Sequence, residues 1–537
     1  MKTLNKIIAL SAVTLLAAGC NDLDTEPFGS TITSDQKETV IAQNPGMMAA
    51  SAQSLLKGLY TVGATASSHH ADFGYGSIMI MLDSRGNDMP AANVGYNWYS
   101  AASEMSDFGA TYYDNYIIWN TMYNEIHTCN SILSTIAEDS ENADFQYYRA
   151  QSYGFRAFCY WNLAQLYQFT YAKNPDAPTV PVILDTNAVE AGANGCARSS
   201  VAEILDQVIS DCNAAIAALE KSGKERSSKT DVNQAVLYGL IARTQLLKVD
   251  YAAAASAAQK AIDLANAEGL SPFSRAEASV PAFFSINEHS WMWGVALNEN
   301  ETQTKGVNNF ASMMGNWLPN GYSAAGVYRC CNAVLYESIP ASDVRKNWFL
   351  DGKGDAPATL PAAYKDMVVN YENYRIEKMF PYTQVKFGAY QNTPGGNIGA
   401  NDYPLMRIEE MYLILAEAQG MQNVSAGVQT LNTFVNTYRD ATYQCSAADA
   451  TAFRKEIHQQ RRIEFWGEGL SYFDILRFQT GIDRRGGGFD PAWVYVVGPD
   501  DLALIYIIPQ SEQQSNAQIG AISSEATVPK PVTDVVE

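Results

Sequence analysis

The sequence contains few basic residues. Its 537 residues include 36 Lys and Arg against 57 Asp and Glu, so the formal net charge is −21. A polyanion of this size repels phosphate backbones, and even the densest basic stretch, Lys221–Lys229, includes Glu225. We therefore expect no nucleic-acid partner. Hydrophobic residues make up 47% of the chain, which is usual for a folded globular protein and excludes a disordered one.

Long apolar runs are also scarce. The one near the start, Ile7–Ala18, follows two lysines and is too short to span a bilayer. It ends in Leu-Ala-Ala-Gly-Cys20, a pattern typical of the bacterial lipobox, in which the cysteine receives acyl chains such as palmitate. The alternative is an ordinary signal peptide in which Cys20 is incidental. The sequence predicts a lipoprotein signal peptide over 1–19, a tether lipidated at Cys20 over 20–43, and one domain over 44–537.

The chain lacks the motifs of metal sites, disulfide scaffolds and common enzymes. Seven cysteines follow Cys20, and an odd number at irregular spacing without any CxxC is not a disulfide framework. HExxH, GxSxG and Walker patterns are absent, and His69-His70 is an isolated pair. The stretch Asp351–Asp355 resembles part of a calcium loop but lacks its middle acidic ligand. We expect no metal, no cofactor and no catalytic residue.

Apolar residues recur at three- and four-residue steps from about residue 113 to 266, which predicts amphipathic helices. Val232–Ala265 has the length of one tetratricopeptide unit, a second helical pair is expected over Tyr403–Tyr438, and a third joins Phe145–Tyr171 to Ser200–Leu219. Each pair leaves an apolar face that only a neighbouring pair buries. The predicted fold class is therefore mainly α, with stacked helical pairs about 113–266 and 403–478, and generic helical hairpins are the alternative. The expected helices are Tyr116–Ala137, Phe145–Tyr171, Val201–Leu219, Val232–Lys248, Ala252–Ala265, Pro404–Gly420 and Ala450–Phe465.

Helical periodicity fades between about 267 and 400, where Gly, Pro, Asn and Trp become frequent. Together with residues 70–112, this stretch is expected to form an irregular, loop-rich binding region with minor β structure. Loops of this length inside a compact protein are often functional. Alternating residues predict short strands at Ser290–Leu297, Ile376–Lys386 and Ala503–Ile508.

Several segments resemble, in order along the chain, the patterns of the SusD/RagB family of outer-membrane lipoproteins. The most specific is Arg461–Arg477, which reads RRIEFWGEGLSYFDILR. Within it, Leu470-Ser471 stands where the family commonly has a basic residue. The other matching segments are Trp119–Asn130, Arg149–Leu163, Tyr403–Ala418 and Ile508–Asn516. The chain is thereby identified as a member of this family over nearly all of its predicted mature length.

This resemblance implies four tetratricopeptide-like helical pairs that cradle an irregular binding region. It also implies a lipid-anchored protein of the outer membrane, facing the cell exterior. Such a protein captures an oligosaccharide and delivers it, without catalysis, to a SusC-like TonB-dependent transporter. The acidic run Asp22–Glu26 resembles the surface-export signal of these lipoproteins. One alternative is an oligopeptide-binding member of the family. Another is a surface glycosidase, but among 57 Asp and Glu residues two can always be proposed as the catalytic carboxylates, so their presence alone is weak support.

Two aromatic stretches are the candidate ligand-binding loops. Aromatic rings stack on the C–H faces of sugars, and polar side chains at the edges replace the hydrogen bonds lost from water. Gly and Pro beside these aromatics favour surface loops over core helices. Alternatively, the rings fill the helix layer or contact the transporter. The candidate ligand residues are Tyr96, Asn97, Trp98 and Tyr99 in the first stretch and Trp317, Asn320 and Tyr322 in the second.

Two groups of charged residues allow more than one interpretation. Asp83 and Asp88, in the polar turn before the first aromatic stretch, are further candidates for ligand binding, and their alternative role is to stabilise that turn. A second group resembles a catalytic cluster, but alternating charges on a helix and the turn after it more often form a buried ion-pair network. We expect this structural role for Arg461, Arg462, Glu464, Glu468, Asp474 and Arg477.

Overall fold

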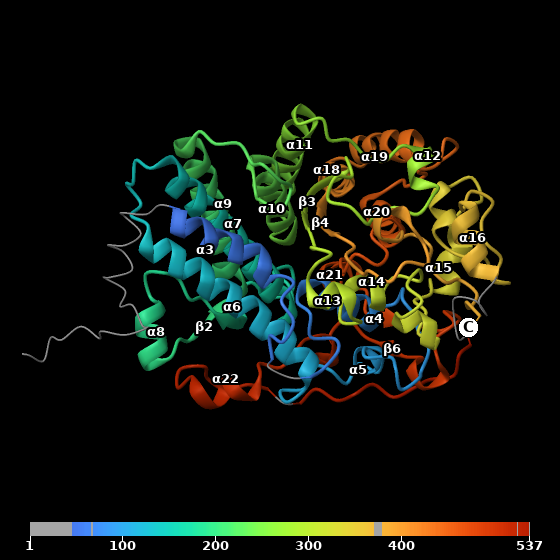
Figure 1. Ribbon diagram of the computed structural model, residues 1–537, viewed down its shortest axis with the longest axis horizontal. Coiled ribbons are helices and arrows are strands. Elements are labelled where there is room, and N and C mark those ends of the chain that lie inside the picture. Colours follow the sequence, from blue (N-terminus) through green and yellow to red (C-terminus); the bar gives the residue numbers. More distant parts are fainter. Residues whose placement is uncertain (1–45, 66–67, 370–377, 524, 536–537) are drawn as a thin grey trace, which may run out of the picture.

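The computed structural model describes residues 46–65, 68–369, 378–523 and 525–535. Figure 1 shows long helices, coloured mainly blue to green, on the left, and on the right a half, coloured mainly yellow to red, in which helices alternate with irregular segments. The predicted signal peptide, Cys20 and the tether lie outside the described residues. None of the helices in the described part of the chain combines the length and apolarity that a membrane span requires.

Long helices form the scaffold and follow the predicted periodicity. Helix α7 packs against α9, α10 against α11, and α18 against α19, so the three expected helical pairs are confirmed, as is the mainly α fold class. Helix α3 (Gly46–Gly58) lies against α6 and α7. The long helices are α6 (Tyr113–Thr135), α7 (Ala143–Leu166), α9 (Val201–Ser222), α10 (Gln234–Leu247), α11 (Tyr251–Ala267), α18 (Ile408–Gln422), α19 (Val424–Tyr438) and α20 (Ala450–Glu464).

Local sequence signals set several helix ends. Ser200 begins α9 with a capping box, in which its side chain accepts from the Glu203 N–H and the Glu203 carboxylate accepts from the Ser200 N–H. In α19, Gly427 lies so close to α18 that an added Cβ would overlap the Cα of Gly420. Small residues therefore allow the close approach of this helical pair.

The irregular region is inserted between two helices that pack against each other. Helix α11 lies directly against α18, although about 140 residues separate them in the sequence. The stacked pairs thus continue across the insertion, as the green α11 and the orange α18 show in Figure 1. This arrangement fixes both ends of the long irregular segment on one rigid scaffold.

Short elements complete the fold. The remaining α-helices are α4 (Tyr75–Arg85), α5 (Ser100–Ser103), α8 (Ala188–Asn194), α12 (Arg275–Ala278), α13 (Thr302–Lys305), α14 (Phe310–Met313), α15 (Ala333–Ser338), α16 (Ala362–Val369), α21 (Ser471–Phe478) and α22 (Gln510–Ser515). The 3₁₀ turns are η1 (Tyr322–Ala325), η2 (Val344–Trp348), η3 (Tyr390–Asn392), η4 (Pro491–Trp493) and η5 (Leu502–Leu504). The strands form three antiparallel pairs, β1 (Pro178–Pro181) with β2 (Arg198–Ser200), β3 (Trp291–Val295) with β4 (Tyr403–Arg407), and β5 (Ile482–Asp483) with β6 (Val496–Val497).

The structure corrects part of the strand and helix predictions. The strand expected at Ser290–Leu297 is β3, but its partner β4 occupies the first residues of the helix expected at Pro404–Gly420, and α18 begins only at Ile408. Backbone pairing with a distant strand, which a local pattern does not reveal, decides the conformation there. The strand predicted at Ala503–Ile508 is wrong, because η5 covers its start. Of Ile376–Lys386, the first two residues lie outside the described residues and the rest form only isolated bridges.

A buried ion-pair network joins the last helices to the irregular half. The Glu464 carboxylate lies within ion-pair distance of Arg345, Arg407 and Arg439, and Glu468 pairs with Arg407. Burial alone raises the pKa of Glu464, but the three guanidinium groups, Arg439 foremost, outweigh burial and hold that pKa below its usual range. The predicted structural role is confirmed for the whole set, through the pairs of Arg461 and Arg477 with Asp474 and of Arg462 with Asp88.

The seven described cysteines are all free thiols. Cys129, Cys159 and Cys212 lie on α6, α7 and α9 and are fully buried among apolar side chains. Burial raises the pKa of each of these thiols well above its ordinary value, so they remain protonated and act as small core residues.

Candidate functional site

The two predicted aromatic stretches meet in space. The loop before α5 carries Trp98, η1 begins with Tyr322, and the two rings lie edge to face with centroids 6.4 Å apart. An isolated antiparallel bridge between Ala91 and Arg329 joins the backbones behind them. More than 200 residues separate these loops in the sequence, so the site forms only in the folded chain.

Two histidines extend this contact into a continuous group of rings. The His70 ring stacks on Trp98 at a centroid distance of 4.5 Å and shares a hydrogen bond with the Tyr322 hydroxyl. The His69 ring lies edge-on to Trp98 at 4.9 Å and stacks on Tyr113 at 5.5 Å. We refer to His69, His70, Trp98, Tyr113 and Tyr322 as the aromatic cluster.

Part of the aromatic cluster faces solvent. Tyr113 is 55% exposed and Trp98 is half-buried, while the neighbouring Tyr96 is 61% exposed. Burial lowers the pKa of His69, so its imidazole is neutral at pH 7. The cluster therefore presents flat ring surfaces with hydroxyl and imidazole groups at their edges, which suits a ligand that is part apolar and part polar.

A groove of about 740 Å³ adjoins the aromatic cluster. His70 belongs to both, because its ring also lines the groove. The segment that follows α3 lines the groove with Tyr60 and Val62, and the loop with α13 lines it with Glu301. Burial and the Glu301 carboxylate, which accepts a hydrogen bond from the Tyr60 hydroxyl at 3.2 Å, raise the pKa of Tyr60 to about 12.

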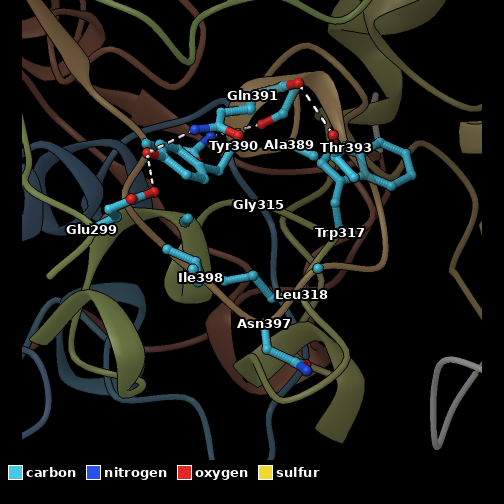
Figure 2. A pocket seen from close by; sticks show the side chains of 14 residues that line it. Glu299, Gly315, Trp317, Leu318, Ala389, Tyr390, Gln391, Thr393, Asn397 and Ile398 are labelled. Carbon is cyan, nitrogen blue, oxygen red and sulfur yellow. Dashed lines mark hydrogen bonds between the residues drawn. The ribbon is translucent and has the colours of Figure 1, made fainter. Parts of the chain in front are cut away.

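A second pocket, of about 190 Å³, lies beside Trp317 (Figure 2). The Trp317 indole stands at one side of it, and Tyr390 and Glu299 stand at the other. The Tyr390 hydroxyl donates to the Glu299 carboxylate at 2.9 Å and accepts from the Gln391 amide at 3.1 Å. We refer to this site as the Trp317 pocket.

The Trp317 pocket has two further features. Gln391 and Asn392 adopt left-handed backbone conformations with φ of 51° and 55°, a strain that tends to collect at functional sites. In addition, Glu299 lines the pocket while the next residues, Asn300 and Glu301, line the groove. One loop therefore contributes to both cavities, with Glu299 in the pocket and Asn300 and Glu301 in the groove, and His70 joins the groove to the aromatic cluster.

Some of the predicted ligand residues are placed for contact, and others are not. Tyr96, Trp98 and Asn320 have exposed surface. Tyr322 is buried, and its hydroxyl bonds to His70 within the aromatic cluster. Trp317 is only 2% exposed and donates its indole N–H to the Phe387 carbonyl at 2.6 Å, so it offers the pocket one ring surface and no polar group.

Four predicted ligand residues lie in the interior, where their side chains bond to the protein. Tyr99 is fully buried and its hydroxyl shares a 3.0 Å hydrogen bond with Ser77. Asp88 pairs with Arg462 and accepts from Ser471, so its carboxylate links this segment to the last helices and does not bond within its own turn. Asp83 accepts from the Gly469 N–H at 2.9 Å, and Asn97 bonds within its own loop. These residues support the loops from behind, because ligand contact requires exposed atoms.

Sequence reasoning missed His69, His70, Tyr113, Tyr390 and Glu299 as members of the site. The His69-His70 pair was weighed only as a metal ligand, although no group of three or more metal-ligating side chains occurs in the described part of the chain. Tyr390 and Gln391 precede the glycine-rich stretch 395–399, and aromatics beside glycine were the signal already used for Trp317.

Comparison with known proteins identifies the family. A model described as "Starch-binding associating with outer membrane", of the SusD-like type, matches residues 37–246, and the SusD family model matches residues 352–531. The chain belongs to the SusD family. The first range covers α6, α7, α9 and nearly all of α10 and the second covers α18 to α20, while residues 247–351, which include α11 and the first part of the irregular region, are unmatched. No curated protein matches the chain significantly.

Solved structures of the SusD superfamily share the fold. A SusD-like carbohydrate binding protein from Bacteroides vulgatus is 22% identical, with a TM-score of 0.69 over 87% of this chain and 96% of that one. A SusD superfamily protein from the same species has a TM-score of 0.70 at 18% identity, over 89% and 98%. Surface glycan-binding protein A from Bacteroides thetaiotaomicron, in complex with laminarihexaose, is 15% identical with a TM-score of 0.61, over 89% and 99%.

Proposed function

We propose that this SusD-family protein binds an oligosaccharide across the aromatic cluster, the groove and the Trp317 pocket. The observation that carries the proposal is the joining of partly exposed aromatic rings to two cavities by loops from distant parts of the chain. Stacking on Trp98 removes apolar ring surface from water at about 25 cal/mol per Å². Hydroxyl, amide and carboxylate groups around the rings are suited to sugar hydroxyls. The glycan complex of the related Bacteroides thetaiotaomicron protein supports this ligand class.

The proposed binding is non-catalytic. The carboxylates beside the cavities already hold protein donors, since Glu299 accepts from Tyr390 and Glu301 from Tyr60. Carboxylates held in this way position the edges of the cavities. A glycosidase instead needs an acid and a nucleophile that both face one scissile bond. Release of reducing sugar from a bound glycan by the purified protein would contradict this part of the proposal.

One substitution in the aromatic cluster and one in the Trp317 pocket test the site. Trp98→Ala should weaken glycan binding at least tenfold, which corresponds to about 1.4 kcal/mol, because it removes the central ring of the aromatic cluster. Tyr390→Ala tests the Trp317 pocket, since the buried Trp317 itself supports packing. Affinities are measured by calorimetry with glycans selected on an array. Tyr148→Ala, a partly exposed aromatic on α7, is the control.

The outcomes separate the alternatives. Wild-type affinity in both Trp98→Ala and Tyr390→Ala would contradict the proposed residues. Binding of oligopeptides, with no glycan retained on the array, would favour the peptide-binding alternative. Tyr148→Ala should keep the affinity of the wild type. This result would show that removing a partly exposed aromatic ring away from the site does not by itself weaken binding.

We further propose that the protein is lipid-anchored through Cys20 in the outer membrane, faces the cell exterior and passes its ligand to a SusC-like TonB-dependent transporter. The lipobox pattern before Cys20 and the acidic run after it support the anchor and the export. Cys20→Ala should move the protein from the membrane fraction to the soluble fraction, as measured by immunoblotting. Retention of the variant in the membrane fraction would contradict the anchor. Co-purification of the transporter with the tagged full chain tests the partnership.

A further inference from the structure

Arg329 differs from the arginines of the ion-pair network because no carboxylate compensates it. Its side chain is only 1% exposed, and no Asp or Glu among the described residues lies within ion-pair distance of it. Its Nη1 atom is buried without a hydrogen-bond partner. A buried cation without a counterion and an unsatisfied donor both lower stability. Such a feature beside a candidate site therefore calls for a functional explanation.

The contacts of Arg329 join the two segments that carry the predicted ligand residues. Its Nη2 donates to the side-chain oxygen of Asn97 at 3.1 Å, and its Nε points at the Met313 carbonyl at 3.4 Å. The guanidinium also lies over the Tyr99 ring, 5.0 Å from its centroid. One side of Arg329 thus holds the loop with Trp98, and the other holds the segment that leads to Trp317.

Asn97 completes the link because an amide both donates and accepts. Its nitrogen donates to the Ala92 carbonyl at 3.1 Å, and its oxygen accepts from the Tyr99 N–H at 3.2 Å as well as from Arg329. An aspartate at this position would neutralise Arg329 but has no donor for Ala92. The neutral amide of Asn97 therefore satisfies the backbone of its loop but leaves the charge of Arg329 without a counterion.

We infer that Arg329 and Asn97 are positioning residues, which hold the Trp98 loop against the Met313–Trp317 segment so that both parts of the glycan site face one ligand. This inference rests on the proposed function and adds to it two buried residues that touch no ligand. Burial lowers the pKa of Arg329 to about 10, so the guanidinium stays charged at pH 7 and its bond to Asn97 keeps the strength of a charged donor.

The experiment compares Arg329→Met and Asn97→Asp with the wild type and with Arg149→Met. Arg149 is the matched control, because it is also buried, has no ion pair among the described residues and donates to the Leu133 and Ile136 carbonyls away from the site. Both site variants should lose at least tenfold in glycan affinity by calorimetry. Asn97→Asp should keep or exceed the wild-type melting temperature, since it gives Arg329 a counterion. The control should lose melting temperature but keep affinity.

Hydrogen exchange tests the same inference without any ligand. Arg329→Met should accelerate amide exchange in peptides covering residues 91–99 and leave peptides of α7 unchanged. Wild-type affinity in both site variants, or unchanged exchange over 91–99, would overturn the inference. If the wild-type protein binds no glycan, the proposed function fails by itself, and the exchange experiment still decides whether Arg329 positions the loop.

Discussion

Asp83 shows how its surroundings set the chemistry of one carboxylate. It lies on α4 with one oxygen bonded to the Gly469 N–H and the other without a partner. Burial, helped by the nearby charges of Asp88 and Glu468, raises its pKa to about 8. Asp83 is therefore largely protonated in the folded protein at pH 7, whereas Asp in an unfolded chain has a pKa of about 4.

This difference predicts a pH dependence of stability. Between pH 4 and 8 the unfolded chain releases the proton and the folded chain keeps it, so the contribution of Asp83 to the free energy of unfolding falls as the pH rises. The slope is at most about 1.4 kcal/mol per pH unit. Asp83→Asn, which carries no proton to release, should match the wild type near pH 4 and exceed it in urea unfolding at pH 8.

The control for this prediction is Glu225→Gln, which neutralises an exposed carboxylate. Its difference from the wild type should stay small and nearly constant between pH 5 and 8. A stability difference between Asp83→Asn and the wild type that does not grow with pH would contradict a raised pKa at Asp83.

At the scale of elements, the helical pairs depend on close contact as much as on apolar area. Gly427 in α19 lies against α18, and a Cβ added to it would meet the backbone of Gly420 and the Ala416 carbonyl. Gly420 in turn faces the Phe453 ring of α20. Three consecutive helices are therefore packed through glycine, and a single methyl group in this contact separates backbones that have little freedom to move.

Gly427→Ala should lower the free energy of unfolding by about 1–3 kcal/mol through overpacking. Gly192→Ala is the matched control, because Gly192 also lies within a helix, α8, and its added Cβ meets no atom within 4 Å. The control should be neutral or raise stability by up to about 1 kcal/mol, as the helix propensity of Ala exceeds that of Gly. Equal effects of the two substitutions in urea unfolding would contradict the close packing of α18 and α19.

For the whole molecule, sequence patterns predicted the scaffold much better than the site. The long helices follow a local period, so the predicted Val201–Leu219 and Ala450–Phe465 agree closely with α9 and α20. Strand β4 was predicted as helix because its pairing with β3 is not local. The sequence also predicted the loops of Trp98 and Trp317. It did not predict which of their side chains face outward, because that depends on distant groups such as Arg329.

The division between a rigid scaffold and loop-borne contacts leads to a prediction for the complete protein. The helical pairs are held by packing and by the ion-pair network around Glu464, whereas the aromatic cluster and both cavities are formed largely by loops. A bound glycan should therefore slow hydrogen exchange in peptides from 93–99, 299–322 and 388–398, and leave α9, α10 and α11 unchanged. Exchange measured with and without the glycan checks this. Protection of α9–α11 with none in the loops would place the ligand elsewhere on the scaffold.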